Sequence, residues 1–97
     1  MHSLEYCLEH ADELAQEVVN AWGVNVDAGN AELLTDNFKA LFEITCRYRT
    51  ARETADNRRQ FNLLNERDAT VEKKTREAFA RAYKDYESKH LPGSLSR

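Results

Sequence analysis

A chain of 97 residues, of which 41% are hydrophobic and 32% charged, is long enough for one small folded domain with a heavily charged surface. Only three glycines and one proline occur, and none of them lies between Asn30 and Leu91, which argues against a sheet because hairpins and turns depend on such residues. The scarcity of these residues predicts an all-α fold class. No run of 18 apolar residues is present, so a membrane-spanning segment is excluded.

The first predicted helix covers residues 4–22, where apolar side chains recur every three or four positions and share one face. Ser3 is a suitable N-cap for this helix, and Gly23 can adopt the left-handed conformation that ends a helix. Residues 24–29 are then expected to form the first loop.

The second predicted helix covers residues 31–54, with Asn30 as its cap, and its apolar residues occupy about half of the circumference. We therefore expect it to be the central element. Residues 54–57 are the expected break, because Asp and Asn side chains compete locally for backbone hydrogen bonds, although a helix that continues through them is the alternative. A third helix is predicted over residues 58–90, and residues 92–97 are expected to be a loose tail.

These elements predict a small bundle of three long helices, formed by a helical hairpin and the N-terminal helix. The third helix would be roughly 50 Å long and the first only roughly 28 Å, so part of the third apolar stripe would be left uncovered. That part is exposed, bent back near residues 65–68 or paired with another chain. This mismatch in length predicts a homodimer, in which Thr75, Ala78 and Ala82 would let a second helix approach closely. Five large side chains are expected in the core: Trp22, Phe38, Leu41, Phe42 and Phe79.

Charge is distributed unevenly along the chain. Residues 1–38 carry eight acidic side chains and no Lys or Arg, whereas residues 39–97 carry 14 basic and 9 acidic side chains. Five carboxylates of the first helix align on one face without a cation among them and predict an acidic partner-binding surface: Glu5, Glu9, Asp12, Glu13 and Glu17. The alternative is an ordinary solvated face, or one that faces arginines of the same chain or of a second subunit.

Five arginines form the strongest basic cluster and predict a surface for a protein partner or for nucleic acid: Arg47, Arg49, Arg52, Arg58 and Arg59. The acidic character of the whole chain, with a pI of about 5.6, argues against nucleic acid. The structural alternative for these arginines is that they neutralise the acidic first helix.

No arrangement of residues predicts catalysis, a metal or a cofactor. Cys7 with His10, and Glu87 with His90, have the spacing of metal ligands on a helix, but each pair is only part of a site. Glycine-flanked nucleophiles and phosphate-binding glycine loops are absent from the sequence. The chain is therefore expected to bind no cofactor and not to be an enzyme.

The function expected from the sequence is that of a non-enzymatic protein–protein interaction module, such as a small inhibitor, adaptor or chaperone, acting through charged helix faces. By general association, and not by derivation from the residues, such proteins include those encoded by phages and other mobile elements. The alternative is a nucleic-acid-binding regulator that uses the arginine cluster. Without a secretory leader or a disulfide framework, a cytoplasmic location is expected.

Overall fold

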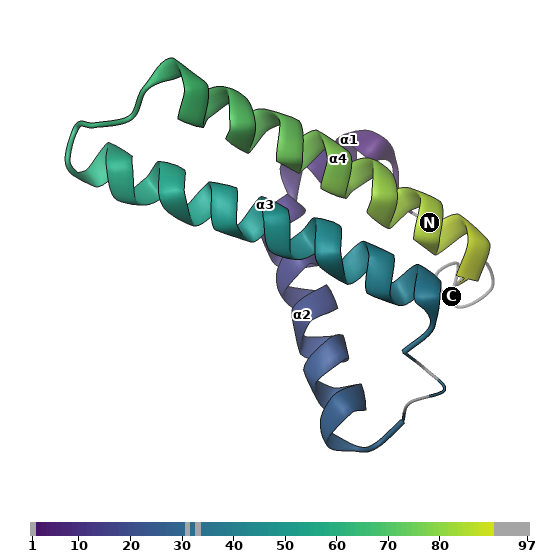
Figure 1. The fold of residues 1–97 in the computed structure, drawn as a ribbon. Coiled ribbons are helices and arrows are strands. Elements are labelled where there is room, and N and C mark those ends of the chain that lie inside the picture. The colour runs from purple at the N-terminus through teal and green to yellow at the C-terminus, as the bar shows by residue number, and fades with distance from the viewer. Residues whose placement is uncertain (1, 31, 33, 91–97) are drawn as a thin grey trace.

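Four helices form in the part of the chain that the computed structural model describes, which is residues 2–30, 32 and 34–90 (Figure 1). They are α1 (Leu4–Glu9), α2 (Ala11–Asp27), α3 (Asp36–Gln60) and α4 (Glu66–His90). The predicted all-α class and the helical bundle with a C-terminal hairpin are confirmed. The expected tail at residues 92–97 lies outside the described residues.

The hairpin of α3 and α4 is the frame of the molecule, and the two helices run antiparallel, side by side (Figure 1). The predicted break at residues 54–57 is wrong, because α3 continues to Gln60. Ala55 is fully buried there, and Asp56 is paired with arginines on its own helix, so packing and ion pairing outweigh the local preference of Asp and Asn.

The chain turns instead between α3 and α4, at residues 61–65. Asn62 adopts the left-handed conformation with φ of 57°, and the amide of Leu63 donates to the carbonyl of Arg58 at 2.7 Å. Asn65 then caps α4 by accepting a hydrogen bond from the amide of Asp68 at 2.8 Å. The third helix therefore does not begin at residue 58. The bend anticipated near residues 65–68 comes closest to the observed turn.

Folding back at this turn removes the length mismatch that motivated the dimer. The two helices of the hairpin have 25 residues each, so α3 lies along α4 over its length. Phe61, which falls within the predicted third helix at residues 58–90, lies in the turn and is 69% exposed. Homodimerisation stays a prediction, without the length argument behind it.

The predicted first helix is divided and longer than expected. His10, with φ of −110° and ψ of 26°, separates α1 from α2, and the two helices meet there at an angle (Figure 1). Gly23 does not end α2, which continues to Asp27 and closes at Gly29, where φ is 71°. Most of the predicted loop at residues 24–29 is therefore helical. The aromatic ring of Trp22, directly before Gly23, stacks on that of Phe42 in α3.

The start of α3 also differs from the prediction of a helix from residue 31 capped by Asn30. Thr35 is the cap, and its hydroxyl accepts a hydrogen bond from the amide of Phe38 at 3.2 Å. Thr35 is a typical N-cap residue with Asp36 in the first turn behind it, and the sequence prediction did not include it as a cap.

The core lies where α1 and α2 pack on one side of the hairpin, α1 chiefly against α4 and α2 chiefly against α3. Of the five side chains predicted to fill the core, Phe38, Leu41 and Phe79 are buried. Trp22 and Phe42 are half-buried at its edge, with ring centroids 4.3 Å apart. The second half of α2 projects away from the hairpin (Figure 1).

Candidate functional site

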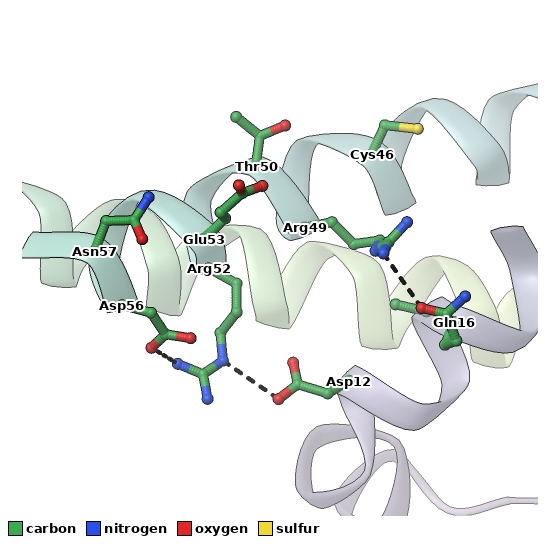
Figure 2. A pocket seen from close by; sticks show the side chains of 10 residues that line it. Asp12, Gln16, Cys46, Arg49, Thr50, Arg52, Glu53, Asp56 and Asn57 are labelled. Atoms are coloured by element: carbon green, nitrogen blue, oxygen red, sulfur yellow. Dashed lines mark hydrogen bonds and ion pairs between the residues drawn. The ribbon is translucent and has the colours of Figure 1, made fainter. Parts of the chain in front are cut away.

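Arg52 is the centre of a polar network that ties three helices together. From α3 its Nε donates to Oδ2 of Asp12 on α2 at 3.3 Å, and its Nη1 donates to Oε2 of Glu72 on α4 at 3.2 Å. It also pairs with Asp56 one turn further along α3 (Figure 2). A cation shared by three carboxylates from three helices holds the helices in register.

Glu72 receives a second arginine. The two terminal guanidinium nitrogens of Arg59, Nη1 and Nη2, donate to its two carboxylate oxygens at 3.0 and 2.7 Å, which is a bidentate pair. The side chain of Glu72 is only 10% exposed. The hydrogen bonds from Arg59 lower the pKa of Glu72, against the opposing effect of burial, and Arg52 lowers it further.

Asp12 has Tyr48 as a second partner, whose buried hydroxyl donates to its Oδ1 at 2.5 Å. The same hydroxyl accepts a hydrogen bond from Nε of Arg76 on α4 at 3.3 Å. Burial raises the pKa of Asp12, but the hydrogen bonds from Tyr48 and Arg52 outweigh it, and the pKa is lowered on balance. Asp12 is thus part of the internal network.

Acid should weaken this network. Because the folded-state pKa of Glu72 lies below its ordinary value of 4.5, its contribution to stability is complete above that pH and is lost as the pH falls through the folded-state pKa. We expect the melting temperature of the wild type to fall steeply below about pH 4.5 and that of Glu72→Gln to fall less. Glu53→Gln is the matched control, because Glu53 is exposed and forms no ion pair with any described residue. If the melting temperatures of the wild type and Glu72→Gln fell equally with pH across the acid range, Glu72 would not stabilise the fold through this network.

The five arginines predicted as a binding surface are thus mostly engaged within the molecule. Arg52 and Arg59 belong to the network, Arg58 pairs with Asp68 at 2.9 Å, and Arg49 donates to the side chain of Gln16 at 3.2 Å. Arg47 alone forms no ion pair or hydrogen bond with another described residue, apart from the helical backbone. A nucleic-acid partner would have to compete with carboxylates for three of the five guanidinium groups.

The predicted acidic face is split by the structure. Asp12 belongs to the network, whereas Glu5, Glu9, Glu13 and Glu17 are exposed and form no ion pair with Lys or Arg in the described part of the chain. Two of these four lie on α1 and two on α2, so the bend between the helices divides them. The acidic and basic clusters therefore meet at Asp12 but do not cover each other.

A hollow of about 590 Å³ lies between α2 and α3, beside the network (Figure 2). Figure 2 shows Arg52 between Asp12 and Asp56, with Arg49 reaching toward Gln16. Most of the charged side chains that line this hollow already form ion pairs or hydrogen bonds within the chain. This hollow is therefore a structural junction between helices, and we assign no ligand to it.

A second hollow, of about 540 Å³, lies between α3 and α4 and is mostly apolar. Its lining includes Ala51 and Thr54 from α3, and Val71 and Thr75 from α4. Smaller hollows of about 180 and 160 Å³ follow it along the same two helices: one adds Ile44, Lys74 and Ala78, and the other adds Ala40, Ala82 and Tyr86. Neighbouring hollows share lining residues, and we call the three together the hairpin groove.

Sequence reasoning found one wall of the hairpin groove and missed the other. The small residues Thr75, Ala78 and Ala82, expected to admit a second helix, do line it on α4. The wall on α3 follows the same helical spacing of three or four, and that signal was present but hidden within the wide apolar sector of α3: Ala40, Ile44, Arg47, Ala51 and Thr54.

Residues 2–30, 32 and 34–90 bring together no group of three His, Cys, Asp or Glu side chains able to hold a metal ion. None of the helices in the described part of the chain combines the length and the apolar character that crossing a membrane requires. Comparison with protein-family models, with curated proteins and with solved structures finds no match to this chain.

Proposed function

We propose that this chain is a non-enzymatic protein-binding module, of the inhibitor, adaptor or chaperone kind, and that the hairpin groove is its main binding surface. The observation that carries the proposal is that α1 and α2 cover one side of the hairpin while the groove on another side stays open. Val71 is 43% exposed there, and Ala78 is exposed.

An open groove of this kind favours a helical partner. Helices pack with their axes 8–10 Å apart, and small residues on the receiving surface permit that approach. The groove presents such residues from both walls, among them Ala51 on α3 and Ala78 on α4. Apolar surface left open between two helices is stabilised when a third element covers it.

The charged faces have a secondary role in this proposal. The exposed carboxylates of α1 and α2 can steer a basic surface of the partner, which raises the rate of association more than the affinity. The arginine cluster supports the alternative of a nucleic-acid regulator less well, because Arg52, Arg58 and Arg59 already pair with carboxylates of the chain. Binding of a partner in the hairpin groove requires no such ion pair to be broken.

The test fills the groove without changing charge. Ala78→Gln places a long, neutral, helix-favouring side chain between α3 and α4, and partner occupancy in a quantitative pull-down should fall at least about tenfold, equivalent to about 1.4 kcal/mol. Ala21→Gln is the matched control, because Ala21 is also an exposed helical alanine but lies on α2. Equal recovery of every bound protein by the wild type and both variants would refute the groove as the binding surface.

A further inference from the structure

The charged side chains around the hairpin groove do not cancel. Five charged side chains line it, and three of these already have a partner within the chain. Asp68 pairs with Arg58 at 2.9 Å, and Asp85 pairs with Lys89 at 3.1 Å. Arg47 on α3 and Lys74 on α4 remain, and neither pairs with an acidic side chain among the described residues.

These two cations lie on opposite walls at the same place along the groove. Both line the small hollow of about 180 Å³, together with Thr75 and Ala78, and Arg47 also lines the large hollow beside it. Both are exposed. An occupant of the groove would therefore lie on an apolar floor of small side chains with one positive charge on each flank.

The groove is long enough for a helix of several turns to lie along it. Its lining residues on α4 extend from Asp68 to Lys89, which corresponds to roughly 30 Å at 1.5 Å per residue. That length matches a helix of about 20 residues. A helix with an apolar stripe toward the floor and carboxylates beside the stripe satisfies both the floor and the flanking cations.

We propose that the hairpin groove binds an acidic amphipathic helix of a partner protein, with Arg47 and Lys74 recognising carboxylates on either side of its apolar stripe. This inference rests on the proposed protein-binding function and adds the chemistry of the partner. Exposed charges of this kind chiefly select between partners, because the wrong sign of charge is repelled.

A second copy of this chain fits the groove less well. In a two-fold dimer the same surface faces itself, so Arg47 and Lys74 at mid-groove would face the same two cations of the second copy. The acidic helix α2 of a second copy is no better, because its apolar residues Leu14 and Val18 are already buried in its own core. Repulsion and the lack of a free apolar stripe both favour a different protein.

The test uses two labelled helical peptides of about 20 residues with the same Ala/Leu stripe, one flanked by Glu and the other by Lys, titrated with the full chain by fluorescence anisotropy. The Glu peptide should bind the wild type at least tenfold more tightly than the Lys peptide, and added salt should narrow this difference. The double reversal Arg47→Glu with Lys74→Glu should invert the preference. Lys39→Glu with Lys73→Glu is the matched control, since these exposed lysines lie on the same two helices but line none of the hollows of the groove.

Each other outcome overturns the inference in a recognisable way. Equal binding of both peptides, abolished by Ala78→Gln, would leave the groove as a protein-binding site and reject recognition by charge. Failure of both peptides to bind would reject the acidic helix as occupant, and the pull-down with Ala78→Gln would still decide the proposed function separately. If sedimentation equilibrium gave a molecular mass twice the 11.2 kDa of one chain, and Ala78→Gln reduced it to the mass of one chain, the groove would be assigned to a second copy.

Discussion

Replacing Phe79 with alanine is expected to lower the free energy of unfolding by about 3–5 kcal/mol, the largest effect that any single core substitution should have here. Phe79 is fully buried on α4. Its ring is stacked on that of Tyr48 on α3, with centroids 5.7 Å apart, and is tilted against that of Tyr83, with centroids 5.9 Å apart. The side chain that is lost thus supports both helices of the hairpin and the core beneath α1 and α2. Neighbours fixed by the polar network, such as Tyr48, cannot collapse freely into the cavity.

Urea denaturation followed by far-UV circular dichroism measures this loss against a total stability of about 5–15 kcal/mol for a small domain. Val71→Ala is the control on the same helix, and because Val71 lies in the open groove its stability should change by no more than about 0.5 kcal/mol. Similar shifts of the urea midpoint for Phe79→Ala and Val71→Ala would contradict the location of the core between α4 and its neighbours.

The fold class could be predicted from the sequence because helical periodicity is a local property. The positions of the ends could not, since they depend on contacts made elsewhere. Gly23 was expected to end the first helix, yet its neighbour Trp22 packs on Phe42 and α2 continues to Asp27. An interior glycine costs about 1 kcal/mol relative to alanine, which such packing can offset.

The turn of the hairpin gives the same lesson in reverse. Asp56 belongs to the sequence that looked most like a break, but its ion pairs with Arg52 and Arg59 stabilise the helix instead. Asn62 supplies the turn because asparagine tolerates the left-handed conformation better than most residues. Neither outcome follows from propensity without the positions of the partners.

The candidate sites depended even more on long-range contacts. The sequence showed an acidic segment and a basic segment and left open whether they pair or face separate partners. The structure pairs Asp12 with Arg52, 40 positions apart, and leaves Glu13 and Arg47 outside that pairing. Periodicity marks the walls of a groove, but only the packing of α1 and α2 decides which side of the hairpin stays open.

A buried carboxylate at the far end of α4 leads to the last prediction. Glu87 was noticed in the sequence for its spacing to His90, but its partner is His2, 85 positions away. The backbone amide of His2 donates to Oε1 at 2.6 Å, and Nδ1 of the His2 ring lies 2.6 Å from Oε2. The side chain of Glu87 is 1% exposed, so these two contacts replace the hydrogen bonds that water would otherwise donate to its carboxylate.

His2→Ala should therefore lower the free energy of unfolding by about 1–3 kcal/mol, because it leaves one oxygen of a buried carboxylate without its donor. Glu87→Leu added to His2→Ala should restore about 1 kcal/mol or more, since an apolar side chain of similar size needs no donor. The restoration separates an unsatisfied carboxylate from a simple loss of packing by the His2 ring, which stacks on Tyr6 at 4.6 Å. Urea midpoints of the wild type, both single variants and the double variant measure the coupling. If the two changes were additive, Glu87 would not depend on His2, and the N-terminal segment would be attached to α4 by its other contacts, such as the hydrogen bond from Nζ of Lys84 to the carbonyl of His2.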